Sequence, residues 1–258
     1  MRRILPLACT SLLLSSTFLT PAFAQEANEQ PSVSLDAITV YATRTPQSSF
    51  EVPASTSSID TEAPGNALAG DTSDLLKYTP GVEVANGPRR NGQTVSIRGF
   101  DNDAIITLMD GRRQNFEAAH DGRFYIDPSL LKRVEVVRGA SSAVYGGGGI
   151  GGVLAFDTKD AADMLAPGDD FGVYSAMGYR SGNEEYAPVV SAFGRTGAFD
   201  VIGIASYRNA GNIRQGGGSE LQTDDELLSG LFKVGYNFND FNNLKFIYQG
   251  LRNDGSEP

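Results

Sequence analysis

Apolar stretches of strand length alternate with tight glycine turns through residues 93–161 of the chain. Charged residues recur inside these stretches rather than between them, as in the run RVEVVR at residues 133–138. This pattern is unlike the core of an ordinary soluble enzyme. It predicts instead a small domain that is itself enclosed by something polar.

Residues 50–162 are predicted to form one compact α+β domain. A short capped helix at residues 72–78 is ended by a proline and a glycine, and Asp127-Pro128 predicts a second, brief helix. The predicted strands are residues 82–85, 94–98, 104–109 and 133–138, and residues 141–145 form at most one helical turn.

From about residue 171 the pattern changes to a series of longer strands. Each has about the length that a tilted barrel strand needs to cross a membrane. The five predicted strands are residues 171–179, 186–194, 199–208, 225–238 and 244–251.

The fourth of these strands has one apolar face and one polar face. Lys233 lies on the polar face with Ser229 and Asn237. The opposite face carries Leu228, Gly230, Phe232, Val234, Tyr236 and Phe238. Alternation of apolar and polar side chains, with aromatic residues near the strand ends, is typical of outer-membrane β-barrels. A secreted β-sandwich has similar strands.

The N-terminus is predicted to direct export. Residues 1–24 combine a basic start, an apolar run and the small residues Ala22 and Ala24 before Gln25, which is the pattern of a cleaved signal peptide. A membrane anchor is the alternative, but the apolar run is short and interrupted. Residues 25–49 form a leader whose first part is polar.

One isolated strand lies within this leader, at residues 35–44, and a proline at position 46 ends it. The periodicity alone favours two interpretations equally. The strand adds to the sheet edge of another protein, or it is an edge strand packed on its own domain.

Composition excludes several classes of function. The single cysteine, Cys9, lies in the signal peptide, so the mature chain has no disulfide, zinc–thiolate or cysteine-nucleophile chemistry. The net charge of −10 argues against nucleic-acid partners. No nucleophile–base pair or metal-ligand set can be assembled, so an enzyme is the least favoured class.

Two further motifs are discounted. The glycines of residues 146–152 are followed by a strand rather than a long helix, so a packed turn is favoured over a phosphate-binding loop. Asp101, Asp103 and Asp110 lack the later ligands of an EF-hand calcium loop.

Five motifs in order carry a family resemblance. They are LKYTPGV at residues 76–82, SIRGF at 96–100, LMDG at 108–111, RVEVVRG at 133–139, and the YG and GGV of residues 145–153. Together they resemble the plug domain of TonB-dependent outer-membrane receptors. The resemblance implies an α+β plug domain followed by antiparallel β-strands of an outer-membrane β-barrel, complete at ~22 strands.

The leader strand is similar to the TonB box of this family, at about residues 36–44, and this resemblance favours strand addition to TonB. The residues implied are Asp36, Ala37, Ile38, Thr39, Val40 and Tyr41. TonB, with its inner-membrane energising complex, is therefore an expected partner.

Within the family, FYIDPSLLKR at residues 124–133 and GGIGGVLAFDTKDA at residues 148–161 resemble the haem and haemoglobin receptor branch. That resemblance implies that His120, the only histidine, is a ligand of haem iron. From the residues alone, a solvated loop histidine is favoured. Haem is the expected transported ligand, with no permanently bound cofactor and no metal other than haem iron.

Three charged strand residues, Arg98, Glu135 and Arg138, are interpreted as buried or wall-facing ion pairs that hold the plug in the barrel. Residues 163–258 supply only about five barrel strands, so we expect an N-terminal fragment that does not transport alone.

The expected location is the outer membrane, with its lipid and haem or haemoglobin as partners. Two other functions remain open: a ferric-siderophore or other metal-chelate receptor, and a soluble periplasmic plug-like binding module.

Overall fold

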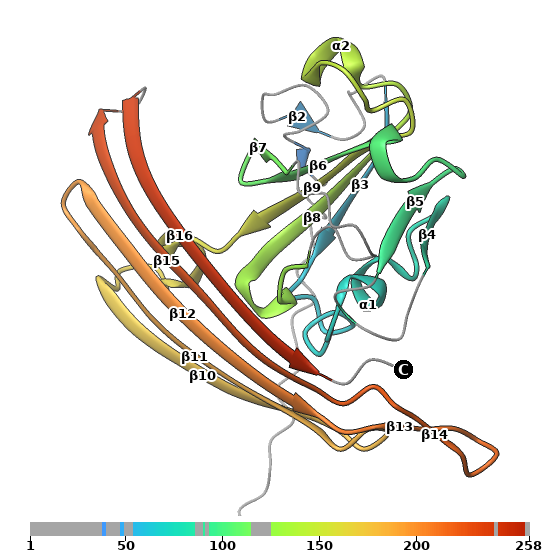
Figure 1. Ribbon diagram of the computed structural model, residues 1–258. Coiled ribbons are helices and arrows are strands. Elements are labelled where there is room, and N and C mark those ends of the chain that lie inside the picture. The colour runs from blue at the N-terminus through green and yellow to red at the C-terminus, as the bar shows by residue number, and fades with distance from the viewer. Residues whose placement is uncertain are drawn as a thin grey trace, which may run out of the picture. The chain divides into compact units, whose positions relative to one another are not determined.

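A computed structural model describes most of the chain after its N-terminal leader. The described residues are 38–39, 47–48, 54–85, 90, 93–114, 125–239 and 242–255. They contain two five-stranded sheets, which are joined in sequence by a short helix, α3 (Ala161–Met164) (Figure 1).

The first sheet, here called the mixed sheet, contains both parallel and antiparallel pairs. Its strands in spatial order are β3 (Ser55–Asp60), β8 (Leu131–Arg138), β9 (Gly152–Thr158), β6 (Ile105–Met109) and β7 (Arg112–Arg113). Strands β6 and β9 run parallel, and the other neighbours are antiparallel. All seven residues of β9 are buried, so this strand is the centre of the sheet in packing as well as in order.

Several short elements accompany the mixed sheet. They are α1 (Thr72–Leu76), the hairpin of β4 (Val82–Ala85) and β5 (Thr94–Ile97), the 3-10 turns η2 (Asn102–Ala104) and η3 (Pro128–Leu130), and α2 (Ser142–Tyr145). Helix α1 begins at Asp71, whose side chain accepts a hydrogen bond of 2.9 Å from the Asp74 amide. The helix and strands expected between residues 72 and 138 are confirmed.

The glycine-rich segment before β9 is a packed turn. Gly152 has φ of +145°, and a Cβ at this position would lie 2.1 Å from the Val137 carbonyl oxygen. Because β9 approaches β8 this closely, only glycine fits here. The structure therefore supports a structural role for these glycines.

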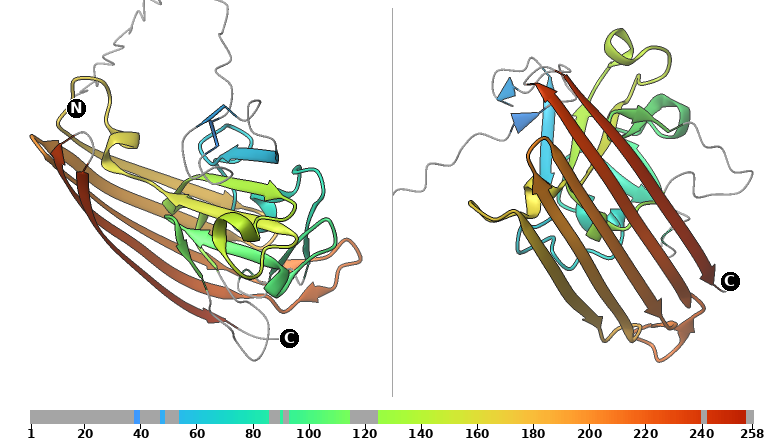
Figure 2. Two further views of the ribbon diagram at one scale, coloured as in Figure 1. Left: turned by 90° about the horizontal axis from the view of Figure 1, so that it is seen from above. Right: turned by 90° about the vertical axis from the view of Figure 1, so that its left-hand side faces the viewer.

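The second sheet, here called the long-strand sheet, is wholly antiparallel. Its order is β10 (Phe171–Arg180), β11 (Glu185–Thr196), β12 (Phe199–Ala210), β15 (Asp225–Asn239) and β16 (Asn242–Gly255). Figure 2 shows these strands side by side, with β10 and β16 as the two edges. A small hairpin of β13 (Ile213–Arg214) and β14 (Glu220–Leu221) lies in the connection after β12.

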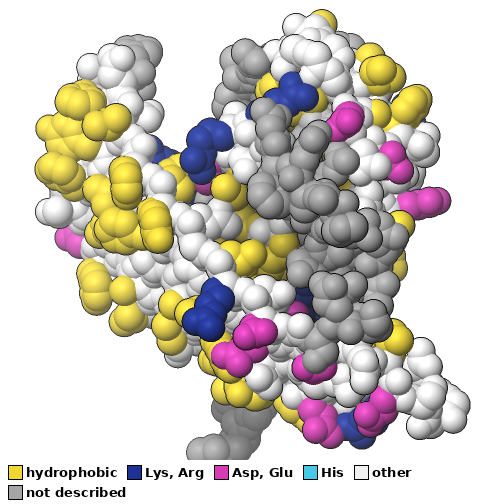
Figure 3. Space-filling view, in the orientation of Figure 1, with side chains coloured by type: hydrophobic (Ala, Val, Ile, Leu, Met, Phe, Trp, Pro, Cys, Tyr) yellow, Lys and Arg dark blue, Asp and Glu magenta, His cyan; other side chains and the backbone are white. Residues whose placement is uncertain are grey.

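Strands β11, β12 and β15 alternate between exposed and buried positions, whereas β10 and β16 have no buried residue. In β15, Leu227, Leu231 and Lys233 are buried, whereas Leu228 and Phe232 between them are exposed. Figure 3 shows hydrophobic side chains gathered over these strands. The expected apolar outer face is confirmed, whereas the inner face, expected to be polar, also carries Leu227 and Leu231. The predicted class of an α+β domain followed by antiparallel strands is confirmed. Within the described part of the chain, no helix is long and apolar enough to cross a membrane.

Candidate functional site

The two sheets are joined by a cluster of buried charges centred on Arg208 of β12. The Arg208 guanidinium forms two parallel hydrogen bonds to Asp127, with Nε 2.9 Å from Oδ2 and Nη2 3.0 Å from Oδ1. Asp127 is fixed in turn as the N-cap of η3, where its side chain accepts a 2.9 Å bond from the Ser129 amide. Paired bonds of this kind fix orientation as well as distance.

Glu185, the first residue of β11, extends this cluster. Its Oε1 accepts a 3.0 Å bond from Nη1 of Arg208, and its Oε2 contacts Nη2 of Arg90. Arg90 also contacts Asp225, the first residue of β15, with Nη1 2.5 Å and 2.6 Å from the two carboxylate oxygens. We call these five residues, Arg90, Asp127, Glu185, Arg208 and Asp225, the arginine cluster.

Four of the five residues of the arginine cluster are buried, and Asp225 is only slightly exposed. Asp127 and Glu185 are each 1% exposed. Burial alone would raise the pKa of Asp127, but the charge and hydrogen bonds of Arg208 outweigh it and hold that pKa below its usual value. Burial also raises the pKa of Tyr125 well above its usual value, so its hydroxyl stays protonated and donates to the Gly70 carbonyl at 3.2 Å.

A second group of charges joins the sheets further along β15. Lys233, 2% exposed, donates to the Thr158 carbonyl at 3.0 Å and to Oδ1 of Asp160 at 3.1 Å, and its Nζ lies 3.5 Å from Asp110. Lys245 of β16 reaches the same oxygen of Asp160 at 3.0 Å, and Lys132 lies 3.3 Å from the other oxygen. We call these five residues, Asp110, Lys132, Asp160, Lys233 and Lys245, the lysine cluster.

Asp160 is the shared acceptor of the lysine cluster. Burial would raise its pKa, but the three surrounding lysines, with Lys233 the largest influence, lower it to about 2. Asp160 is therefore ionised at every physiological pH. Its backbone amide also donates to Asp163 at 2.7 Å, at the start of α3.

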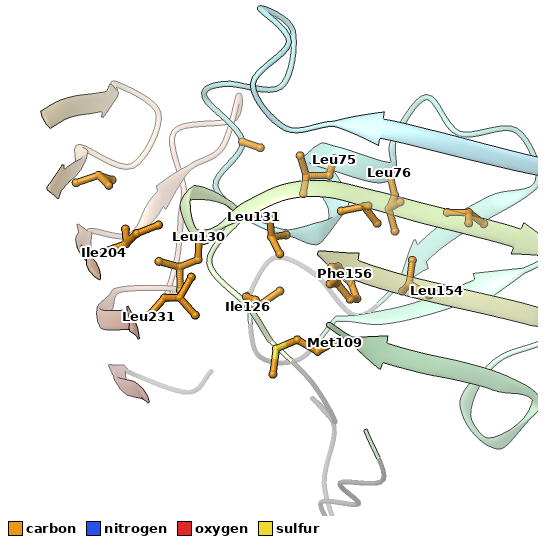
Figure 4. Close-up of a cluster of buried hydrophobic side chains, with 14 of the residues drawn as sticks. Leu75, Leu76, Met109, Ile126, Leu130, Leu131, Leu154, Phe156, Ile204 and Leu231 are labelled. Atoms are coloured by element: carbon orange, nitrogen blue, oxygen red, sulfur yellow. The ribbon is translucent and has the colours of Figure 1, made fainter. Parts of the chain in front are cut away.

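Apolar side chains from both sheets pack into one cluster of buried residues. Leu130 of η3 and Ile126 belong to it, as do Ile204 of β12 and Leu231 of β15. Figure 4 shows Leu130 beside Ile204 and Leu231. The two sheets thus share polar contacts and part of one hydrophobic core.

Strand β10 packs less closely than β12 and β15 against the part of the chain that precedes it. A cavity of about 770 Å³ lies between residues 61–69, η3 and α3 on one side and the start of the long-strand sheet on the other. Leu68, Met164 and Tyr174 contribute to its lining. Arg180 of β10 makes a 2.5 Å contact with Asp74 and a 2.7 Å bond to the Leu68 carbonyl.

Comparison with known proteins relates this two-sheet arrangement to a protein family. The family described as TonB-dependent Receptor Plug Domain matches residues 48–153. The chain belongs to the TonB-dependent receptor family. The mixed sheet is accordingly the plug, and the long strands are barrel strands.

Relatives at higher identity cover nearly the whole chain. The Hemin receptor of Yersinia pestis is 36% identical over 98% of this chain and 37% of the relative. The Heme/hemopexin utilization protein C of Haemophilus influenzae is 36% identical over 96% of this chain and 33% of the relative. The chain thus spans about a third of the length of the curated relatives it matches.

Solved structures agree in fold. The hemophore receptor HasR of Serratia marcescens, a double mutant in complex with its hemophore HasA and heme, matches with a TM-score of 0.71 and 27% identity over 78% of this chain and 32% of that one. The FrpB iron transporter of Neisseria meningitidis matches with a TM-score of 0.66 and 25% identity, over 77% of this chain and 32% of that one.

The predicted haem ligand and most of the predicted TonB box lie outside the described residues. His120 is among them, as are Asp36, Ala37, Val40 and Tyr41. The described pair Ile38–Thr39 forms the short strand β1, which pairs antiparallel with β2 (Gln47–Ser48). Among the described side chains, no group of three or more histidine, cysteine or carboxylate residues is arranged to hold a metal ion.

The predicted plug charges Glu135 and Arg138 make contacts inside the plug. Arg138 is buried and donates to the Pro80 carbonyl at 2.8 Å, and Glu135 lies 3.2 Å from Arg133 on the same strand. Arg98 is exposed at a turn with φ of +53°. These contacts of Glu135 and Arg138 are made within the plug, and their role in holding the plug in the barrel stays a prediction.

The residues that do join plug and barrel were not singled out from the sequence. The alternation predicts Lys233 on the polar face of its strand, but it does not indicate the partner, Asp160. Arg208 and Glu185 lie near strand ends, where a charge is ordinarily solvated. The available signal was a charge on the same face as buried apolar residues, as at Lys233 between Leu231 and Gly235.

Proposed function

We propose that the chain acts in a TonB-dependent receptor that takes up haem iron across the bacterial outer membrane. The observation that carries this proposal is 36% identity to a protein named Hemin receptor over 98% of this chain, which spans both plug and barrel strands. A structural match to a receptor solved with heme gives further support. Residues 1–24 would direct export, and the apolar outer face of the long strands would contact lipid.

In this proposal His120 supplies an axial ligand to the haem iron. It is the only histidine of the chain, and a neutral imidazole is a good iron ligand. The test replaces His120→Ala in the product of the native gene, expressed in a bacterial haem auxotroph that lacks other haem receptors. We expect haem binding to weaken at least about tenfold and the absorption spectrum of the haem-loaded protein to shift.

Asp121→Ala, at the neighbouring position, is the matched control and should retain both affinity and spectrum. An unchanged spectrum in the His120 variant would refute the ligand assignment. A wild-type product that is exported to the outer membrane but supports no growth on haem would refute the proposed uptake itself.

TonB capture is assigned to residues 36–41. A strand already forms at Ile38–Thr39, and extended segments of this kind bind partners by adding to a sheet edge. Proline removes a backbone donor, so Ile38→Pro should abolish energised uptake while haem binding at the cell surface remains. Loss of surface binding together with uptake would contradict this separation of roles.

A ferric-chelate receptor is the second candidate, supported by the match to the FrpB iron transporter. The same strain distinguishes the two. Growth on haem without uptake of labelled ferric siderophores supports the haem function, and the reverse result supports the second candidate.

A further inference from the structure

The contact between the plug and strands β11, β12 and β15 is built on buried charges. Asp127, Glu185 and Lys233 are almost completely buried although all three are charged groups. Charges are removed from water in this way only when their partners hold them with good geometry. The parallel bonds from Arg208 to Asp127, at 2.9 Å and 3.0 Å, meet that condition.

Several separate plug segments converge on the arginine cluster. Arg208 reaches Asp127 and also the Ala69 carbonyl at 3.4 Å, and Arg90 donates from Nε to the Gly70 carbonyl at 3.1 Å. Glu185 joins the two arginines through its two oxygens. The cluster therefore ties the chain before α1, the chain at Arg90 and the chain before η3 to three barrel strands at once.

The lysine cluster ties down the C-terminal part of the plug in the same manner. Lys233 comes from β15 and Lys245 from β16. Thr158 is the last residue of β9, and Asp160 lies two residues after it. Buried leucine and isoleucine side chains from both sheets add apolar contact to these two charged attachments. Detaching this face of the plug would break both clusters and expose apolar surface together.

The β10 side of the plug has a different character. A cavity of about 770 Å³ separates much of β10 from the plug, and Glu185 and Arg208 also line it. The ion pair of Arg180 with Asp74 leaves both side chains about a third exposed. An exposed ion pair contributes little to stability. The plug is thus held very unequally by the barrel strands that the structure describes.

We propose that the face of the plug on β11, β12 and β15 is its fixed side, which stays attached while the receptor transports its ligand. Arg208, Glu185 and Lys233 act as positioning residues that hold this attachment, and the passage for the ligand forms elsewhere around the plug. This inference rests on the proposed transport function.

The test is a reversible tether across the fixed side. Leu130→Cys combined with Ile204→Cys places one thiol on each side of the contact, and Cys9, in the predicted signal peptide, is the only cysteine among the 258 residues of this chain. In the product of the native gene, we expect haem uptake after oxidation to stay within threefold of uptake after reduction. A loss of more than threefold that reduction restores would overturn the proposal.

The matched control is a disulfide within the barrel wall. Ser191→Cys with Ile204→Cys joins directly opposed residues of β11 and β12, so this bond lies within the barrel wall and does not tie it to the plug. Uptake by this variant sets the baseline for any effect of oxidation or of the cysteine at position 204, and the threefold threshold is measured against it.

A second measurement needs no haem, so it separates this inference from the proposed function. Arg208→Met should raise hydrogen exchange at residues 125–131 at least about 100-fold, because a buried carboxylate loses its partner. Arg195→Met, at an exposed position of β11, should leave exchange there unchanged. Wild-type exchange in the Arg208 variant would overturn the fixed side even if haem uptake is demonstrated.

Discussion

Strands β9 and β15 are both long and regular, yet they are buried in opposite ways. All seven residues of β9 are buried, whereas β15 alternates between buried and exposed positions along most of its length. The plug strand is covered on both faces, and the barrel strand is covered on only one. The exposed positions of β15 therefore show which face is turned away from the plug.

The two regions also differ in how their buried charges are compensated. Glu135 of β8 lies close to Arg133 of the same strand. Lys233 and Arg208 of the barrel strands reach instead to carboxylates of the plug, Asp160 and Asp127. Because each region holds one half of these two pairs, they form only where the plug and the barrel strands are in contact.

The largest effect that separates the two strands is expected from truncating an aromatic residue in each. Phe156 of β9 is 1% exposed, whereas Phe232 of β15 is 43% exposed. Phe156→Ala should cost about 3–5 kcal/mol because it removes a core side chain and leaves a cavity. Phe232→Ala should cost less than about 1 kcal/mol. Hydrogen exchange of β6, the neighbour of β9, measures the difference in the purified protein.

The comparison fails if the two variants have equal effects on β6. A similar loss of protection in both would mean that β15 contributes as much to the plug core as β9 does. Phe232→Leu, which keeps an apolar side chain, is the control for a general effect on the barrel strands.

Much of this fold could be predicted from the sequence because alternation is a local property. The five long strands were predicted within a few residues of their observed bounds, since the period of two persists through each of them. Strand β3 was not predicted. Its sequence, STSSID, has a single large apolar residue, and only its pairing with β8 makes it a strand.

The charged contacts were less predictable because they join distant positions. Arg208 and Asp127 are 81 residues apart, and Lys233 and Asp160 are 73 residues apart. Nothing local marks either pair. The family motifs predicted the plug. They include Arg138, but the partners of Arg138 are Pro80 and Ser57, which lie within the plug.

A smaller effect is expected from neutralising a buried charge of the plug. Glu135→Gln keeps the shape of the side chain but removes the charge that faces Arg133, at a cost of about 1–3 kcal/mol. Glu226→Gln, at an exposed position of β15, should change stability by less than about 0.5 kcal/mol. Equal effects would show that burial does not distinguish the two glutamates, and exchange at β8 is the measurement.

The smallest effect concerns the pH dependence of the attachment between the two regions. The folded pKa of Asp160, about 2, lies below its ordinary value of 3.8, so the ionised carboxylate stabilises the folded protein. That contribution is fully present above about pH 4 and is lost as the pH falls through about 2. At neutral pH it amounts to about 1–2 kcal/mol after allowance for solvent screening.

Asp160→Asn should therefore be less stable than wild type at pH 6, and the difference should shrink toward zero near pH 2. Thermal unfolding of both proteins across this range measures it. Asp169→Asn, at an exposed position just after α3, should stay within about 0.5 kcal/mol of wild type at pH 6. A difference between Asp160→Asn and wild type that does not change with pH would mean that Asp160 stabilises the contact through hydrogen bonds alone. The lysine cluster would then hold the plug by geometry, and its charges would not be what binds the two regions together.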